Sequence, residues 1–323
     1  MQPGLYFTSV VATLLAGAAP GPAMSARTMS NSCQIIDSFR DFIDLSTVVA
    51  NASADQQLAA FHKDFLAKNL ALYVDDAVGL TPGPKLDRLA LRSMATARSN
   101  PLWREMDATV RLSLPGVAAR FAAALPDFRC DFPIYVAPSF GQMDGAGRLV
   151  GGRPALILGV DTISSVESPG QLPVFLTHEM FHRYHFQVAG FSDDPGEHQL
   201  IWRTLWAEGL ATYVSAQLNP SNPLSDALIA PRDLEVQARP LTAMLAQELR
   251  AGLDREDGPL YGTFFEYGDP LAKQRSLPWR SGYYIGYRVA CELAKRHPLA
   301  ELAHLEGPSL RKEIGDALAT LRP

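Results

Sequence analysis

An apolar run that begins at Pro173 carries three polar residues in the pattern His-Glu-x-x-His, which are His178, Glu179 and His182. If the run is a helix, the two histidines lie one turn apart on the same face. Two imidazoles at this spacing can bind one metal ion, and zinc is the ion most often found there. Glu179 would lie about 100° around the helix from His178, where its carboxylate faces a metal-bound water. The alternative is a surface helix with two exposed histidines.

A second helix is predicted at about 197–218, after a loop that contains glycine and proline, and Glu208 lies within its apolar run at 205–210. This loop allows the second helix to fold back against the first, and Gly209 would permit close contact between them. A catalytic zinc ion commonly has three protein ligands, and two histidines with one glutamate are a common set. A buried carboxylate must be paired or bound to a metal, so we predict Glu208 as the third ligand. The alternative is an exposed position, because glutamate favours helices.

The two runs together carry a family resemblance. H-E-M-F-H at 178–182, followed by W-A-E-G-L-A-T-Y at 206–213, resembles the gluzincin metallopeptidases. The resemblance is greatest to a branch of predicted zinc-dependent proteases of unknown function, which has a run similar to G-Y-Y-I-G-Y at 282–287. It extends over residues 117–296 and implies a thermolysin-like zincin core in an α+β, mostly helical fold. In such a core a small mixed sheet packs on the motif helix, and an edge strand, matched here by residues 155–160, holds an extended peptide or protein substrate by backbone pairing.

One position departs from the thermolysin pattern. Thr212 stands where thermolysin-like enzymes have an aspartate that orients a zinc-binding histidine. Metal-binding histidines usually donate their second ring N–H to such a partner. The partner is therefore left open among Thr212, Asp193 and Asp194. His185, one turn after the motif, is expected to be exposed or to support a ligand.

The residues also predict a reaction. Zinc on the three predicted ligands would lower the pKa of its bound water towards about 7. Glu179 would accept a proton as this water attacks a carbonyl and pass it to the leaving amine. The oxyanion needs a second stabiliser, for which Tyr283 is the first candidate and Tyr287 the second, although aromatic residues at this spacing are also common in cores. We predict a zinc metallopeptidase; the alternatives are a non-catalytic zinc-binding protein and a zinc hydrolase of a non-peptide amide.

The N-terminus predicts export. Residues 5–19 are apolar or small, and the small residues that follow resemble the cleavage zone of a secretory signal. We predict a signal peptide at 1–25, a periplasmic or secreted protein, and no stable membrane association after cleavage. The first four residues contain no lysine or arginine, so an uncleaved anchor is the alternative, for which the apolar stretch is short.

Periodicity divides the rest of the chain into a helical N-terminal region at 26–126 and a catalytic domain at 127–323. The first region contains one long helix at 54–74 and a later helix that Pro115 interrupts. The second begins with strands at 131–137 and 154–160, joined through a glycine-rich turn at Asp144-Gly145.

Charge and cysteine content limit the partners. The net charge of −5 provides no basic field for nucleic acid. The three cysteines allow at most one disulfide, and Cys130 and Cys291 are expected to be small buried residues. No cysteine lies near the histidine motif, so a thiolate-rich zinc site is not predicted. The substrate, the cleavage preference and the oligomeric state are not specified by the sequence.

Overall fold

The structure is a computed structural model that describes residues 33–74, 77–190, 200–256 and 258–323. The predicted signal peptide lies outside these ranges. The described residues belong to one compact unit, Asn31–Pro323, so the predicted boundary near residue 127 falls inside it. Within the described ranges, no helix has both the length and the apolar character that crossing a bilayer requires.

Four strands form one small mixed sheet in the order β1-β2-β4-β3. β1 (Gln34–Asp37), β2 (Pro133–Ala137) and β4 (Arg153–Gly159) are parallel, and β3 (Gly145–Val150) is antiparallel to β4. β1 corrects the prediction that the N-terminal region is all helical. Its four residues are too few for a periodic signal, and they are held as a strand by pairing with the distant β2.

The hairpin between β3 and β4 differs from the prediction. Gly145 begins β3 instead of forming the turn, which lies at Gly151 and Gly152 with φ of 57° and 73°. Glycine reaches this left-handed region without steric cost. β4 is paired on both sides, so the prediction that residues 155–160 form an edge strand is wrong. The edge strand on this side of the sheet is β3.

A disulfide joins Cys33 to Cys130, whose Cα atoms are 5.0 Å apart. It ties the residue before β1 to the segment that leads into β2. The expectation that Cys130 is a small buried residue is wrong, because it is only partly buried and forms the one disulfide that the cysteine count allows. Cys291 is the remaining thiol and is partly buried.

Helices and short helical turns fill the N-terminal part of the described chain: α1 (Ser38–Val48), α2 (Ala54–Ala60), a π-helical turn (Phe61–Phe65), a 3-10 turn (Leu66–Lys68), α3 (Leu70–Val74), α4 (Pro84–Ser99) and α5 (Leu102–Ala124). The predicted helix at 54–74 is broken, because burial of Phe61 and Phe65 and a bond from Asn69 Nδ2 to the Phe65 carbonyl (2.9 Å) stabilise tighter and wider turns. α5 continues through Pro115, contrary to prediction. A proline removes one helical hydrogen bond, but Leu114 and Val117 on either side are fully buried.

The remaining described helices follow the sheet: α6 (Val160–Val166), α7 (Leu172–Ala189), α8 (Ile201–Leu218), α9 (Leu224–Ala227), α10 (Leu234–Ala238), a 3-10 turn (Arg239–Leu241), α11 (Thr242–Ala251), α12 (Gly258–Phe265), α13 (Pro270–Gln274), α14 (Ser281–Leu293), α15 (Leu299–Leu302) and α16 (Gly307–Thr320). The α+β, mostly helical fold class is confirmed. α6 was not predicted, and Pro240 lies in the 3-10 turn between α10 and α11.

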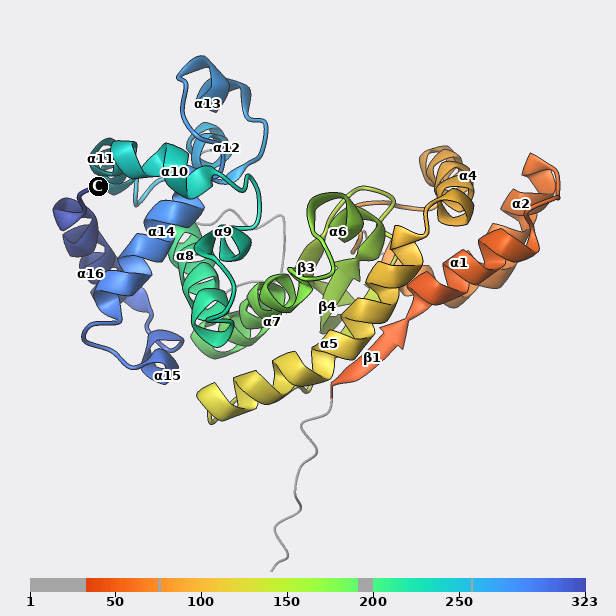
Figure 1. The fold of residues 1–323 in the computed structure, drawn as a ribbon, viewed down its shortest axis with the longest axis horizontal. Helices are drawn as coiled ribbons and strands as arrows, with labels where there is room; N and C mark the ends of the chain where they lie inside the picture. Colours follow the sequence, from red (N-terminus) through yellow and green to blue (C-terminus); the bar gives the residue numbers. More distant parts are fainter. Residues whose placement is uncertain (1–32, 75–76, 191–199, 257) are drawn as a thin grey trace, which may run out of the picture. The chain divides into compact units, whose positions relative to one another are not determined.

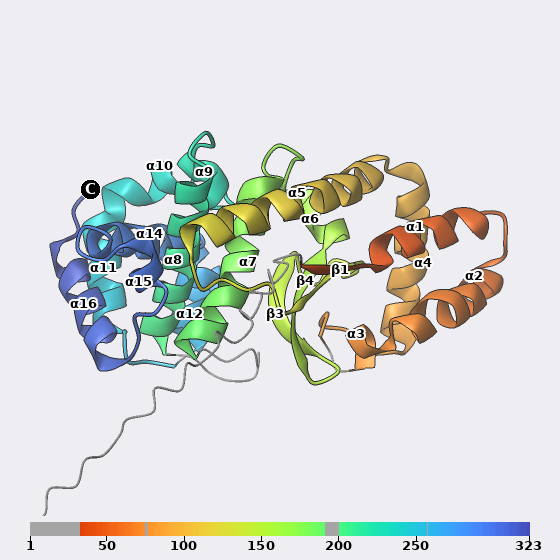
Figure 2. The same ribbon diagram turned by 90° about the horizontal axis from the view of Figure 1, so that it is seen from below.

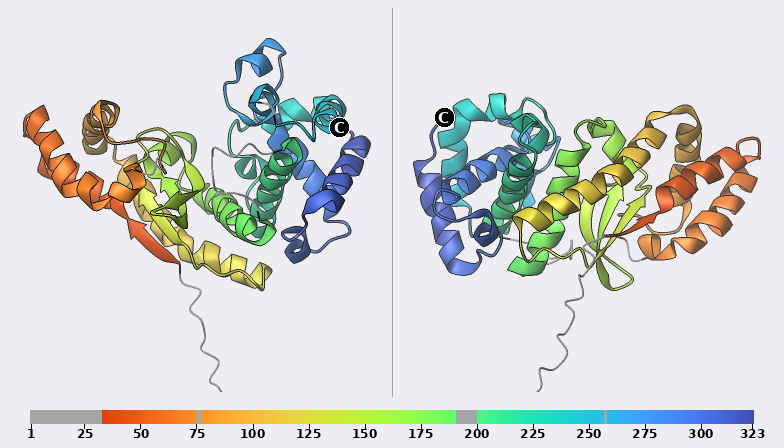
Figure 3. Two further views of the ribbon diagram at one scale, coloured as in Figure 1. Left: turned by 180° about the vertical axis from the view of Figure 1, so that it is seen from behind. Right: turned by 60° about the horizontal axis from the view of Figure 1, so that its bottom comes forward.

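α7 lies between the sheet and the C-terminal helices (Figures 1 and 2). It packs against β3 and β4 on one side and against α8 on the other, and α5 runs past α6 and α7 (Figure 3). α8 in turn crosses α14 closely. A Cβ atom on Gly209 would lie 2.2 Å from the backbone carbon of Gly286. Gly209 therefore permits close helix packing, as predicted. The helix that it contacts is α14, however, and not the predicted α7.

Candidate metal centre

α7 brings the histidine motif into the interior. Pro173 occupies its first turn, and Gly190 ends it in the left-handed conformation with φ of 64°. His178 and His182 are 2% and 8% exposed, because the helix is covered by the sheet, α5 and α8. The alternative of a surface helix with exposed histidines is wrong.

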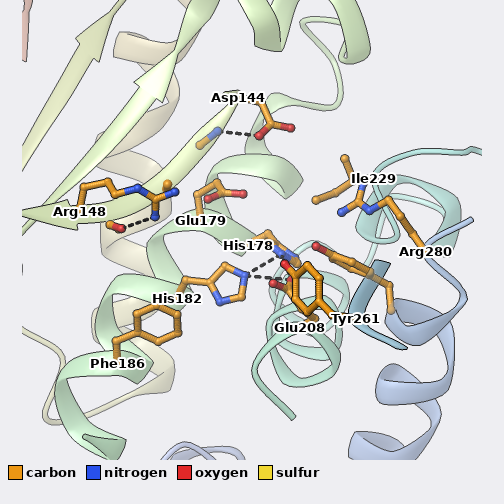
Figure 4. Close-up of a pocket in the computed structure, with 14 residues that line it drawn as sticks. Asp144, Arg148, His178, Glu179, His182, Phe186, Glu208, Ile229, Tyr261 and Arg280 are labelled. Carbon is orange, nitrogen blue, oxygen red and sulfur yellow. Dashed lines mark hydrogen bonds and ion pairs between the residues drawn. The ribbon is translucent and has the colours of Figure 1, made fainter. Parts of the chain in front are cut away.

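Glu208 of α8 meets the two histidines. Its Oε2 lies 3.3 Å from His178 Nε2 and 3.2 Å from His182 Nε2, and the two Nε2 atoms are 2.9 Å apart (Figure 4). Two ligands placed about 2.05 Å from a tetrahedral ion lie about 3.3 Å apart. The side chain of Glu208 is only 21% exposed, so the alternative of an exposed helical position is also wrong. The three residues form a group that can hold a metal ion.

The charges of this group depend on burial and on one another. Burial lowers the pKa of His178 to about 4. Burial would raise the pKa of Glu208, but the two histidines outweigh it and hold this pKa well below its usual range. Burial also lowers the pKa of His182, but the Glu208 carboxylate has the larger effect, so the pKa of His182 is raised overall. A neutral His178 beside an ionised Glu208 is the protonation state that metal binding requires.

Glu179 lines the same pocket but is not one of the three clustered residues. Burial raises the pKa of its carboxyl to about 8, and a cation bound nearby would favour the ionised form. β3 passes directly over this side chain. A Cβ atom on Gly145 would lie 2.5 Å from Glu179 Cδ, so only glycine fits here without displacing the carboxyl.

Tyr283 is the only one of the two tyrosine candidates that lies at the pocket. Its ring stacks on His178 at a centroid distance of 6.2 Å and an angle of 19°. Tyr287 is not among the described residues that line the pocket. Its ring lies against that of Tyr213, with the ring centroids 6.4 Å apart. Tyr284, which follows Tyr283 in the sequence, is buried and accepts a hydrogen bond from Arg288 Nη1 (2.9 Å).

Several residues of the pocket were missed by sequence reasoning. They are polar or aromatic side chains from separate parts of the chain: Asp144, Arg148, Phe186, Tyr261 and Arg280 (Figure 4). None belongs to a local motif, and only the fold brings them together. The pocket has a volume of about 280 Å³.

The second ring nitrogens of His178 and His182 have no partner among the described residues that were predicted for this role. Within the described ranges, neither His178 Nδ1 nor His182 Nδ1 has a hydrogen-bond partner. Thr212 is not that partner, because its hydroxyl donates to the Glu208 carbonyl of its own helix (2.8 Å). Asp193 and Asp194 lie outside the described residues. His185 is fully buried and stacks on Phe181 at 5.2 Å, so it is not exposed, and burial lowers its pKa to about 3.

Comparisons of the chain with known protein families, with curated proteins and with solved structures find no match. The chemistry of the pocket is therefore the basis for a function. Its described residues combine a group able to bind a metal, a buried carboxyl in the same pocket, a tyrosine and a guanidinium.

Proposed function

We propose that the protein is a zinc metallopeptidase of the gluzincin type. The observation that carries the proposal is the position of Glu179, a buried carboxyl in the pocket of the His178, His182 and Glu208 group but outside that group. A purely structural metal site needs four ligands and no additional carboxyl. A hydrolytic site needs three ligands and a separate base, and this chain has residues for both roles.

The ligand set favours zinc. Two imidazole nitrogens and one carboxylate oxygen suit a borderline ion in tetrahedral geometry, whereas magnesium and calcium prefer oxygen ligands alone. When bound, zinc would supply an acidified water molecule and polarise a carbonyl group. His178, His182 and Glu208 would hold the ion, and their burial would exclude competing water.

The remaining residues divide the proton and charge transfers among them. Glu179 would accept a proton on its carboxylate and return it to the leaving amine. Tyr283 would donate its hydroxyl hydrogen to the substrate oxygen that becomes negative. The high pKa of Tyr283, raised mainly by burial, keeps that hydroxyl protonated at neutral pH.

The substrate would lie along β3. Asp144, Gly145, Ala146, Gly147 and Arg148 line the pocket, and β3 is an end strand of the sheet. An extended peptide can pair with the backbone of such a strand and place a peptide bond beside Glu179. This replaces residues 155–160, which are paired on both sides, as the substrate-binding strand.

We also propose that the protein is exported. The Cys33–Cys130 disulfide supports this, because such bonds persist mainly in oxidising compartments. It is consistent with the signal peptide predicted at residues 1–25. Expression with and without these residues, followed by fractionation, would test export directly.

The decisive experiment compares metal content and hydrolysis in matched variants. Wild type should contain about one zinc per chain, and His178→Ala and Glu208→Ala should each lose it. Glu179→Gln should keep the zinc and lose cleavage of a mixed peptide library by at least about 10³-fold. Glu301→Gln, an exposed glutamate on α15, controls for handling.

The outcomes separate the alternatives. If the protein only binds zinc, both the wild type and Glu179→Gln would contain zinc and neither would cleave the library. A hydrolase of a non-peptide amide would leave the library intact but cleave small amide substrates. Full zinc retention in Glu208→Ala would contradict the ligand assignment.

A further inference from the structure

Arg280 stands at the wall of the pocket in a strained and well-supported position. It immediately precedes α14 and has φ of 59°, a left-handed conformation that costs a residue with a side chain about 1 kcal/mol. Its Nη1 donates to the Ala230 carbonyl at 3.0 Å, and its Cζ lies 3.9 Å from the centre of the Tyr283 ring. These contacts hold the planar group in one orientation beside the metal-binding group (Figure 4).

Arg280 has no carboxylate partner within the described part of the chain. Other partly buried arginines do; Arg232, for example, pairs with Glu167 at 2.5 Å. The carboxyls nearest to Arg280 are engaged elsewhere. Asp144 accepts from the Gly145 N–H at 2.8 Å, and Glu208 contacts both histidines. A guanidinium has five N–H donors, and the Ala230 carbonyl uses one of them, while the Tyr283 hydroxyl is close enough to interact with the group.

The charge balance of the pocket favours an anionic ligand once a metal is bound. Three carboxyls, those of Asp144, Glu179 and Glu208, line it together with the guanidiniums of Arg148 and Arg280. With all five groups ionised the pocket carries one net negative charge, and a bound divalent cation would change this to one net positive charge. A partly buried guanidinium whose charge is not balanced by a carboxylate favours an arriving anion.

We infer that Arg280 binds a carboxylate of the substrate, so that the preferred substrates are peptides with a negative charge next to the bond that is cut. The planar guanidinium matches a carboxylate through two parallel N–H bonds. The carboxylate can come from the C-terminus of a peptide or from an acidic side chain. The inference rests on the proposed function only in identifying the ligand as a substrate.

Binding can be measured without hydrolysis. The probes are N-acetyl-Ala-Phe with a free carboxylate and the same compound as its amide, titrated calorimetrically into zinc-loaded Glu179→Gln. The acid should bind about tenfold more tightly than the amide, as one charge-assisted hydrogen bond allows. Arg280→Gln in the same background should remove most of the difference, whereas Arg280→Lys should keep more of it.

Two controls isolate the effect. Arg148→Gln removes one positive charge from the same pocket and should preserve most of the acid preference. Zinc content and thermal unfolding of each variant show whether the metal and the fold are retained. Because the metal can itself bind a carboxylate, the comparison that counts is the acid-to-amide ratio in Arg280→Gln against that in Arg148→Gln.

A second pair of probes distinguishes the source of the carboxylate. N-acetyl-Ala-Asp-amide and N-acetyl-Ala-Asn-amide differ only in a side-chain charge, so a preference for the first identifies an acidic side chain. Equal or absent binding of acids and amides, or an acid-to-amide ratio as large in Arg280→Gln as in Arg148→Gln, overturns the inference. If the acid preference depends on Arg280 but no peptide is hydrolysed, the carboxylate site stands and the peptidase proposal fails.

Discussion

Gly145→Ala would push the added methyl group into Glu179. The new Cβ would lie 2.5 Å from Cδ and 2.6 Å from both Cγ and Oε2 of Glu179. An ordinary carbon–carbon contact is about 3.6 Å, so the carboxyl must move by about 1 Å. If Glu179 is the proposed base, a displacement of this size would lower the rate by about 10²-fold. Overpacking of the site costs about 1–3 kcal/mol in stability.

A double-mutant cycle measures this contact independently of any activity. Glu179→Ala removes all three atoms that the methyl group would meet. The destabilisation by Gly145→Ala, followed by urea unfolding, should therefore disappear in the Glu179→Ala background, with a coupling energy of about 1–3 kcal/mol. The control is Gly116→Ala, where the nearest atom to a new Cβ is Arg120 Nη1 at 3.8 Å.

Additive effects of the two substitutions would refute the reasoning, because they would mean that the destabilisation by Gly145→Ala does not come from contact with Glu179. Zinc content should stay at the wild-type level in Gly145→Ala, since no metal-binding atom is displaced. Peptide cleavage, if the proposed function holds, should fall while zinc is retained.

Three further predictions concern stability. Gly209→Ala should lower the free energy of unfolding by about 3 kcal/mol, because the Cβ would meet the backbone of Gly286 at 2.2 Å and backbone cannot give way. Burial, aided by a neighbouring carboxylate, raises the pKa of Asp107 from 3.8 to about 6. Between these pH values the folded state binds more protons than the unfolded state. The free energy of unfolding should therefore fall as the pH rises from about 4 to about 6, and Asp107→Asn should remove this dependence. Replacing Cys33 and Cys130 by serine should cost about 2–4 kcal/mol in urea unfolding, because the disulfide closes a long loop.

A specific experimental result would contradict each of these predictions. A Gly209→Ala variant as stable as wild type would mean that α8 and α14 can separate at no cost. A pH dependence of unfolding that survives Asp107→Asn would assign it to another group. For the disulfide, Cys291→Ser is the matched control and should leave the unfolding curve in place; an equal loss there would point to thiol chemistry in place of loop closure.

The metal-binding group could be predicted because its information is local. His178 and His182 lie on the same face of any regular helix. A buried carboxylate in the second apolar run must be paired or bound to a metal. Glu208 completes the group through one contact between adjacent helices. The strands also showed in the sequence, since β2 and β4 are runs of β-branched and aliphatic residues.

The rest depended on contacts that the sequence does not display. β1 is too short to be periodic, and its partner strand lies about a hundred residues away. Gly145 looked like a turn residue because glycine after aspartate is typical of turns; its actual constraint is the carboxyl of Glu179 beneath it. Arg280 carried no signal at all, because a single arginine before a helix has many possible roles.

The close crossing of α8 and α14 has a consequence for reading relatives of this chain. A Cβ atom on Gly286 would lie 2.5 Å from the Leu205 carbonyl oxygen and 2.8 Å from Gly209 Cα, so both glycines are required by geometry alone. The atoms that a Cβ at either position would meet first belong to this crossing and not to His178, His182 or Glu208. A descendant that lost His178 and kept both glycines would be a folded protein without the chemistry, whereas one that kept His178 and lost a glycine would have rebuilt the crossing.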